Sequence, residues 1–522
     1  MRTCAVGLAA VLVAVAGWAG AGEITPETRG AEAGPVFSVV PGPPLWRPAE
    51  LRPKAAVADT LEQVVDQCVG DAMAAGDTPG ASVAVIVGGE LVYEQGYGVK
   101  LRGGTDPVDA DTIFRIGSVT KMLTAAAVMQ QVDAGTVFLD DPVTRYVPEL
   151  EFAGHWPDEA MTVEHLLTHA TGIPDLVFNR IGDTGPDALS DWAVALAEVG
   201  LHAPPGTFYN YSNPNFNLAG LVVERVTGTP YREYMASRVF GPAGMTRTTF
   251  DPAAVAADGN AASGHDNTAP AGELTYAPDG YDNGAYAPAG YAFSTAGDLA
   301  RWALLLADGG GAVLSPQSAI AMQAPRRDMG LLPGYAYGYG VFVEPVYDLT
   351  VRQHGGNIWG WGSFLLWHPE RRFAVAVLAN TFQSLPGAAY CIADAVLEPD
   401  HSVVPSYPAD PDRIALFEGV YEAGLVAQVE PQPYPVLGEV LRDGDELLLM
   451  LWDPNSLWFD VWPLEHVALD LFLADVDEDG TPDLDLTFLT SAGTPERVRW
   501  LRMRPLVGTP QVAPRSGGRL IP

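Results

Sequence analysis

The sequence contains the stretch Phe114-Arg115-Ile116-Gly117-Ser118-Val119-Thr120-Lys121. Apolar residues spaced three to four apart follow it and predict an amphipathic helix that ends near Gly135. Because residues three apart share a helix face, the Lys121 amine lies beside the Ser118 hydroxyl and can accept its proton. Lysine occurs only three times in the 522 residues, so about 0.1 chance matches to Ser-x-x-Lys are expected.

This spacing makes Ser118 a candidate nucleophile and Lys121 its candidate base. The amine can act in this way only if burial or a neighbouring cation lowers its pKa. The alternative is an ordinary helix start, with a serine cap and a solvated lysine. Four further stretches favour the catalytic interpretation, and they lie at 162–175, 205–213, 288–300 and 353–366.

Taken together and in this order, the five stretches resemble the penicillin-recognising serine hydrolases. The resemblance is to the group of class C β-lactamases, D-alanyl-D-alanine carboxypeptidases and esterases, and it covers roughly residues 59–398. It implies that Ser118 forms an acyl-enzyme after activation by Lys121. It also implies that Tyr211 shuttles protons, as a phenol ionised beside an ammonium, and that Asn213 orients the substrate and steadies Lys121.

The third element of that group is commonly Lys-Thr-Gly, whereas this chain has His354-Gly355-Gly356. A histidine gives weaker, pH-dependent binding of a substrate carboxylate than a lysine does. The resemblance therefore implies a substrate-binding strand with His354, Gly356 and Asn357. Its oxyanion hole would use the backbone N–H groups of Ser118 and Asn357, and each such donor contributes about 3 to 4 kcal/mol.

The resemblance implies an α/β (α+β) fold, in which helices flank an antiparallel sheet and a helical insertion spans about 140–287. Alternating segments at 81–87 and 90–97, joined by Gly88-Gly89, predict the hairpin that opens the sheet. Strands within 337–380 would return beside it, and Ser118 would lie at the edge of the sheet. Short alternating strands after residue 412 predict a small β-rich domain at the C-terminus.

Composition divides the chain further. Residues 1–21 have the pattern of a signal peptide, and 22–58 resemble an extended leader. The predicted segments that follow are a hydrolase domain at 59–398, a linker at 399–412 and the β-rich domain at 413–522. We therefore expect a secreted or periplasmic protein that does not insert into a membrane once the signal is removed. The sequence leaves the oligomeric state undetermined.

Removal of the signal leaves two cysteines, Cys68 and Cys391. In the group that the chain resembles, the first and last helices of the domain pack side by side on the sheet. The resemblance therefore implies a disulfide between these cysteines, and two separate buried thiols are the alternative.

The formal net charge of −35 argues against binding nucleic acid or anionic membranes. No cofactor is expected, and the pair His165 and His169 lacks the glutamate of a zinc helix motif. The segment 475–483 resembles the start of a calcium loop, but Leu486 stands where a glutamate should close it. A solvated turn is the favoured interpretation there, and calcium remains open.

Tyrosines recur every five residues in a loop rich in glycine, proline and aspartate, at Tyr276, Tyr281, Tyr286 and Tyr291. With Trp359 and Trp361 they could form an aromatic rim for an apolar acyl group, or they could pack on the domain surface.

The sequence thus predicts an exported serine hydrolase acting through Ser118 on esters or on amides and peptides of D-amino acids. One alternative is a β-lactamase proper. Another is a protein that binds penicillin or cell-wall peptides without turning them over, and a degenerate, inactive member of the group also stays open.

Overall fold

The computed structural model describes residues 60–403 except 154–159, 176–183, 202, 267–273, 330–333 and 359, together with the backbone of the strands between 419 and 516. The signal peptide, the leader, Trp359, the candidate calcium loop and most of the linker lie outside the described residues.

An antiparallel sheet of eight strands forms the centre of the described region, in the order β2-β1-β12-β11-β10-β9-β8-β7. The first two strands form the predicted hairpin, with positive φ at Gly88 and Gly89 in its turn. The strands are β1 (Gly80–Val87), β2 (Glu90–Gly98), β7 (Arg327–Asp328), β8 (Ala336–Tyr337), β9 (Phe342–Val346), β10 (Leu349–Ile358), β11 (Trp361–His368) and β12 (Phe373–Ala379).

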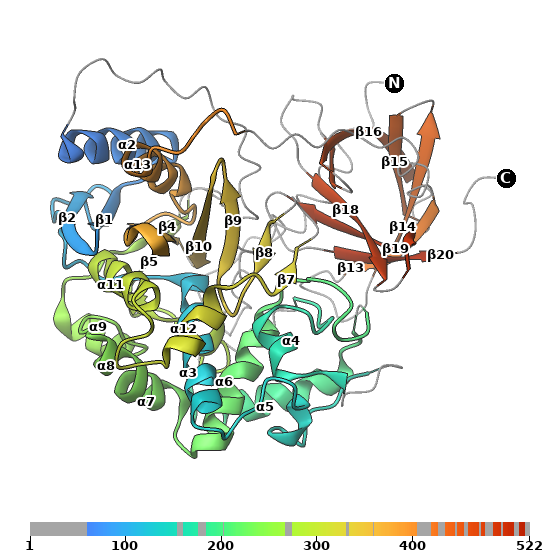
Figure 1. The fold of residues 1–522 in the computed structure, drawn as a ribbon, viewed down its shortest axis with the longest axis horizontal. Coiled ribbons are helices and arrows are strands. Elements are labelled where there is room, and N and C mark those ends of the chain that lie inside the picture. Colours follow the sequence, from blue (N-terminus) through green and yellow to red (C-terminus); the bar gives the residue numbers. More distant parts are fainter. Residues whose placement is uncertain are drawn as a thin grey trace, which may run out of the picture.

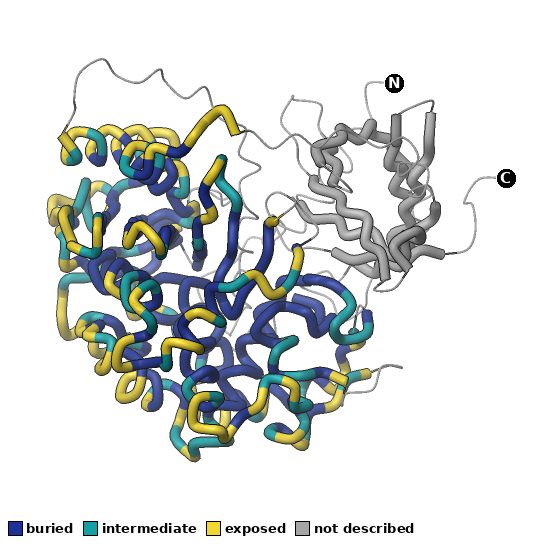
Figure 2. The backbone as a smooth tube through the Cα atoms, viewed as in Figure 1, coloured by how far each residue is buried: buried dark blue, intermediate teal, exposed yellow. Residues whose placement is uncertain are grey.

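Helices cover both faces of this sheet (Figure 1). Along β12, Val375 and Val377 belong to the core that includes α2 (Leu61–Ala75) and α13 (Pro386–Leu397), while the alternate residues face the larger core. A strand buried on both faces has no polar side, which explains why β12 is a continuous apolar run. Figure 2 shows the same pattern as dark blue strands at the centre of this region.

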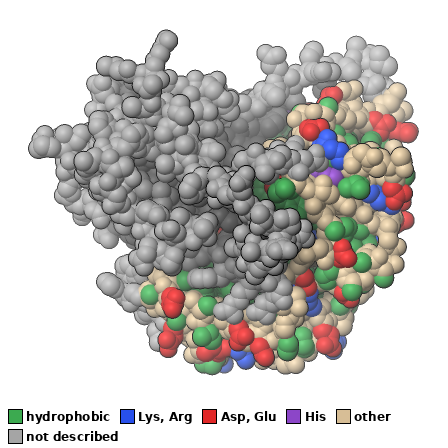
Figure 3. Space-filling view, turned by 180° about the vertical axis from the view of Figure 1, so that it is seen from behind, with side chains coloured by type: hydrophobic (Ala, Val, Ile, Leu, Met, Phe, Trp, Pro, Cys, Tyr) green, Lys and Arg blue, Asp and Glu red, His purple; other side chains and the backbone are tan. Residues whose placement is uncertain are grey.

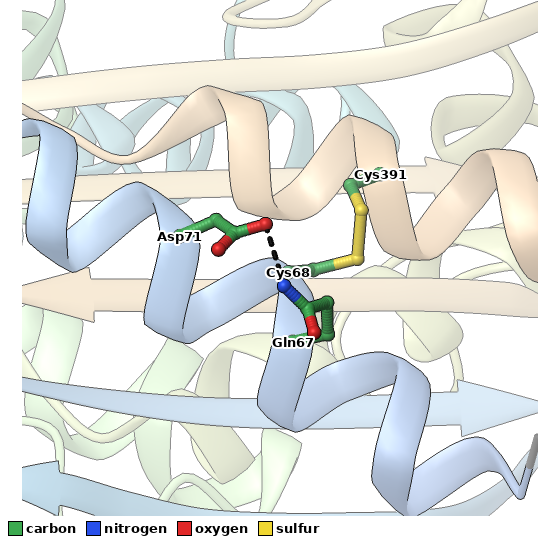
Figure 4. Close-up of a disulfide and its surroundings, with 4 residues drawn as sticks. All are labelled: Gln67, Cys68, Asp71 and Cys391. Atoms are coloured by element: carbon green, nitrogen blue, oxygen red, sulfur yellow. Dashed lines mark hydrogen bonds between the residues drawn. A yellow bond between two sulfur atoms is a disulfide. The ribbon is translucent and has the colours of Figure 1, made fainter. Parts of the chain in front are cut away.

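Helices α2 and α13 pack side by side and are joined by a disulfide between Cys68 and Cys391 (Figure 4), whose Cα atoms are 5.8 Å apart. This confirms the bridge that the family resemblance implied. The helix α2 begins at the capping box of Thr60 and Gln63.

The helix after the Ser-x-x-Lys stretch, α3 (Thr120–Asp133), is preceded by a 3-10 turn, η1 (Gly117–Val119). Almost every residue of α3 is buried, so it is a central helix and not the amphipathic one that the spacing predicted. The other described helices are α4 (Val163–Leu167), α5 (Ala188–Val194), α6 (Asn213–Thr227), α7 (Tyr231–Tyr234), α8 (Gly241–Ala243), α9 (Pro252–Asp258), α10 (Ala287–Gly290), α11 (Ala296–Ala307) and α12 (Pro316–Gln323).

Two short strand pairs complete this part of the chain: β3 (Phe114–Arg115) with β6 (Phe293–Ser294), and β4 (Gly264–Asp266) with β5 (Leu274–Tyr276). After it, the strands β13 to β20 form a closed antiparallel barrel in chain order. The fold is thus the expected mixture of helices and an antiparallel sheet, followed by a β domain. The barrel strands are β13 (Gly419–Leu425), β14 (Tyr434–Asp443), β15 (Glu446–Asp453), β16 (Trp458–Ala468), β17 (Leu471–Ala474), β18 (Leu484–Ser491), β19 (Thr494–Pro505) and β20 (Gln511–Ser516).

On the face shown in Figure 3, Asp and Glu side chains are scattered over the described surface, with Lys and Arg between them. This distribution agrees with the acidic composition of the chain. Within the described part of the chain, no helix combines the length and the apolar character needed to cross a membrane.

Candidate active site

The turn that carries Ser118 is held from two sides. On one side, the Ser363 hydroxyl of β11 donates to the Ile116 carbonyl at 2.7 Å. On the other, the backbone N–H of Ile116 donates to the Ala292 carbonyl at 3.0 Å. Gly117 has a φ of +48°, and a Cβ there would stand 2.6 Å from the backbone nitrogen of Asn357. Only glycine fits, because the turn approaches β10 so closely.

The side chain of Lys121 has no exposed surface and points at Ser118. Its Nζ lies 3.1 Å from Ser118 Oγ, 2.6 Å from Asn213 Oδ1 and 2.7 Å from the Ala289 carbonyl oxygen. Burial lowers the pKa of Lys121 to about 7, and the carboxylate of Asp175 acts in the opposite direction. The role of a base requires a lysine of which a useful fraction is neutral, and burial of Lys121 favours the neutral amine.

Asn213 is the first residue of α6. The helix can begin here because the next residue, Pro214, suits the first turn of a helix, where its missing N–H has no partner to lose. The Asn213 side chain is buried, so its amide faces Lys121 from a rigid element.

Asp175 is a site residue that the sequence did not single out, although it ends the stretch 162–175. One of its carboxylate oxygens accepts from the Asn213 backbone N–H at 2.9 Å, and the other accepts from Asn213 Nδ2 at 3.3 Å. Burial raises the pKa of the Asp175 carboxyl, and these two hydrogen bonds act against that rise. The contact between Asp175 and Asn213 could not be predicted from their spacing in the sequence, because it joins a loop after α4 to the start of α6.

Tyr211 is buried beside these groups, and the centre of its ring lies 4.9 Å from Lys121 Nζ. Its hydroxyl makes no hydrogen bond of normal geometry within the described residues. Burial raises the pKa of Tyr211 well above 10, and the nearby Ser118 side chain offsets this only in part. The expectation that a neighbouring ammonium would ionise the phenol is therefore wrong for the protein without substrate, because desolvation dominates.

His354 also differs from its expected state. It is fully buried, with Nε2 3.0 Å from the hydroxyl of Tyr337 and Nδ1 2.7 Å from the Gly355 carbonyl oxygen. Burial lowers its pKa to about 3. The ring is consequently neutral at pH 7, and the expected pH-dependent binding of anions near neutral pH does not follow from this geometry.

Strand β10 presents the remaining site residues. It pairs with β11 along residues 352–358, but with β9 only along 349–353, and no other described strand pairs with it beyond that point. A Cβ on Gly356 would stand 2.1 Å from the Ile116 carbonyl oxygen and 2.8 Å from Ser118 N. β10 is an interior strand in the order of the sheet, but on the β9 side it has no described strand partner after residue 353. Ser118 lies against this unpaired part of β10, whereas the sequence placed it at the edge of the whole sheet.

The candidate oxyanion hole lies where these segments meet. The Ser118 turn lies directly against the backbone of Gly356 and Asn357, because neither Gly117 nor Gly356 has room for a Cβ. The Asn357 side chain donates to the Phe382 carbonyl. The side chain is thus anchored away from the turn, and Asn357 offers its main chain to the site.

The two histidines considered as zinc ligands, His165 and His169, have structural roles. His165 Nδ1 accepts from the Thr162 backbone N–H and caps α4, while His169 packs 4.2 Å from Tyr211, centre to centre. No group of three or more potential metal ligands occurs among the described residues. The recurring tyrosines form neither an exposed rim nor a surface layer, since three of them are buried in the core, namely Tyr276, Tyr286 and Tyr291.

Comparisons with known proteins found related sequences. The model of the Beta-lactamase family matches residues 65–397. The unguisins hydrolase ungD' of Aspergillus campestris is 30% identical over 344 residues, which cover 62% of this chain and 63% of that protein. The chain spans 63% of the length of the curated relatives that it matches first.

Two solved structures share the fold. SurE has a TM-score of 0.65 and 24% identity, and the match covers 87% of this chain and 99% of SurE. A D-stereospecific amidohydrolase from Streptomyces sp. has a TM-score of 0.52 and 24% identity, with 64% of this chain and 97% of that chain covered.

Proposed function

Because the chain belongs to the β-lactamase family, we propose that it is a serine hydrolase that forms an acyl-enzyme at Ser118. The proposed substrates are amides and peptides of D-amino acids, or esters. One observation carries the proposal: a fully buried lysine, with a pKa lowered to about 7, lies 3.1 Å from the Ser118 hydroxyl. A neutral amine at that distance is within reach to act as a general base.

In the first step, Lys121 accepts the Ser118 proton while Oγ attacks the substrate carbonyl carbon. The carbonyl oxygen becomes an oxyanion, which the backbone N–H groups of Ser118 and Asn357 would stabilise. Collapse of this intermediate breaks the bond to the leaving group and leaves the acyl group on Ser118. Water then attacks the acyl carbon while Lys121 accepts its proton. Collapse of this second intermediate breaks the bond to Ser118 Oγ, which takes the proton back from Lys121, and the acid is released.

The leaving group needs a proton when it is an amine. Tyr211 would give one, because it is buried beside Ser118 and burial raises the pKa of its phenol, which favours the protonated form. The proton taken up by Lys121 then returns to Tyr211, so that the net transfer is from Ser118 to the leaving amine. In this account Tyr211 acts first as an acid, whereas Lys121 is the base.

The substrate class rests on two supports. The relative from Aspergillus campestris is called a hydrolase, and one structural neighbour is called a D-stereospecific amidohydrolase. In addition, the neutral His354 supplies no cation for the carboxylate of a β-lactam. Efficient β-lactam turnover is therefore the second candidate, favoured by the family match alone.

We also propose that the protein is exported. A disulfide joins Cys68 and Cys391, and such bonds persist in oxidising compartments. The signal-like segment at 1–21 supports the same location.

The test compares turnover of four substrates: a D-amino-acid p-nitroanilide, its L-enantiomer, a p-nitrophenyl ester and a chromogenic cephalosporin. We expect hydrolysis of the D-anilide or the ester to exceed that of the cephalosporin, and to disappear in Ser118→Ala. Rapid turnover of the cephalosporin would instead favour the β-lactamase assignment. Activity that survives Ser118→Ala would contradict the nucleophile.

A further inference from the structure

The three neighbours of Lys121 Nζ are not equivalent. A neutral amine has two N–H groups and one lone pair. The Ala289 carbonyl and Asn213 Oδ1 can only accept hydrogen bonds, and they lie closest to Nζ, at 2.7 and 2.6 Å. When both of them take an N–H of the amine, the lone pair is left for the third neighbour, the Ser118 hydroxyl. This is the geometry that a base needs.

The arrangement depends on which end of the Asn213 amide faces Lys121. With the ends exchanged, the NH2 group would face the amine, and Oδ1 would face the carboxylate of Asp175. Two donors would then meet at Lys121, and two acceptors would meet at Asp175. The observed orientation avoids both conflicts, because Asp175 accepts from Nδ2 and also from the backbone N–H of Asn213.

We propose that Asp175 is a positioning residue that fixes the Asn213 amide and thereby aims the lone pair of Lys121 at the Ser118 hydroxyl. The inference rests on the proposed function and deepens it. Asp175 does not touch the nucleophile: it acts through Asn213, which lies between the carboxylate and the amine.

The charge of Asp175 has a second effect on Lys121, which can be separated from positioning. The titratable groups around Lys121 in the described chain are Asp175, Tyr211, His169 and His354. Burial keeps both histidines neutral at pH 7 and keeps the phenol protonated. Asp175 is therefore the group of this set that stabilises the ammonium form of Lys121, and its removal should favour the neutral amine at lower pH.

The experiment measures the rate of Ser118 acylation by p-nitrophenyl acetate against pH, followed by intact mass after acid quench. In Asp175→Asn, we expect the plateau rate to fall by about tenfold to a hundredfold, because the amide is no longer held. We expect the midpoint of the pH profile to move to lower pH, because the carboxylate is gone.

The exchange variant Asp175→Asn/Asn213→Asp makes the test sharper. Asn at position 175 can donate to a carboxylate at position 213, whose other oxygen can accept from Lys121. We expect the plateau rate to recover by about tenfold or more over Asp175→Asn. The midpoint should move above that of the wild type, because a carboxylate then contacts the amine directly. Should Asp175→Asn fail to fold, the upward midpoint of the exchange variant still tests the proposal.

Asp298→Asn is the matched control, since Asp298 is another buried aspartate, bonded to the backbone N–H of Arg247. It should lower the melting temperature without moving the midpoint. Midpoints that stay at the wild-type value in both Asp175 variants, or that move in the same direction, would overturn the inference alone. Absence of any Ser118-dependent adduct on the wild type would overturn the proposed function and the inference with it.

Discussion

The amine of Lys121 lies 3.1 Å from the hydroxyl of Ser118, in surroundings that leave the lysine side chain no exposed surface. A lysine in water is almost fully charged at pH 7 and cannot accept a proton. The burial of Lys121 changes that, because desolvation disfavours the ammonium form. This relationship between a base and a nucleophile is the basis of the predictions that follow.

The acylation rate should rise with pH and level off above a midpoint near 7, where Lys121 loses its proton. Tyr211 has a pKa raised well above 10, so its ionisation should not reduce the rate between pH 8 and about 10. Lys121→Met should lower the plateau rate by about a hundredfold or more. Lys100→Met is the matched control, because Lys100 pairs with Asp106 at the surface. A flat profile, or an equal loss in both variants, would contradict this role.

Substitution of Tyr211 by phenylalanine should separate amide from ester turnover. The variant lacks the phenol that protonates a leaving amine, so amide hydrolysis should fall by about a hundredfold or more. Acylation by p-nitrophenyl acetate should change little, because p-nitrophenolate leaves without a proton. Steady-state rates with matched anilide and nitrophenyl ester substrates check this. Equal losses on the two substrates would mean that Tyr211 serves as the base for Ser118.

The two glycines of β10 should tolerate alanine very differently. A Cβ on Gly356 would stand 2.1 Å from the Ile116 carbonyl oxygen, whereas the atom nearest to a Cβ on Gly355 belongs to the Phe364 ring and would be 3.4 Å away. Gly356→Ala should therefore displace the Ser118 turn and lower the acylation rate by about a hundredfold. Gly355→Ala should keep the rate within about threefold of the wild type. A wild-type rate in Gly356→Ala would show that the turn does not depend on this close approach.

Glu344 on β9 should make the stability depend on pH. It is buried, its carboxylate accepts from Tyr390 and Gln353, and burial raises its pKa from 4.5 to about 7. Between those values the unfolded chain releases a proton that the folded chain keeps, so the unfolding free energy should fall as pH rises from 4.5 to 7.

Glu344→Gln removes this titration. The variant should be more stable than the wild type at pH 8, by on the order of 1 to 2 kcal/mol, and nearly equal to it at pH 4. Denaturant unfolding at the two pH values measures the difference. Glu198→Gln, at an exposed position, is the control and should shift neither value. A variant that is equally stable or less stable at pH 8 would contradict the prediction.

Short-range features could be predicted from the sequence. The hairpin turn at Gly88 and Gly89 and the spacing of Ser118 and Lys121 each depend on residues a few positions apart. Backbone geometry fixes such relationships almost independently of the rest of the chain. The disulfide needed the family resemblance in addition, because 323 residues separate its cysteines.

What escaped prediction depends on distant segments that meet in the folded chain. Asp175 reaches Asn213 from another loop, and the Tyr337 hydroxyl meets His354 from another strand. The sequence around these residues does not indicate which distant segment each of them will contact. Burial of Tyr286 and Tyr291 was missed for the same reason, since a loop-like composition conceals segments that fold into the core.

The most direct test of the central claim is intact-mass spectrometry of the wild type and Ser118→Ala after brief exposure to p-nitrophenyl acetate. The account predicts an acetyl adduct on the wild type that maps to Ser118, and none on the variant. A parallel exposure to penicillin should give slower or weaker labelling. An adduct that persists in Ser118→Ala, or no adduct and no turnover in the wild type, would contradict the assignment of Ser118 as the nucleophile.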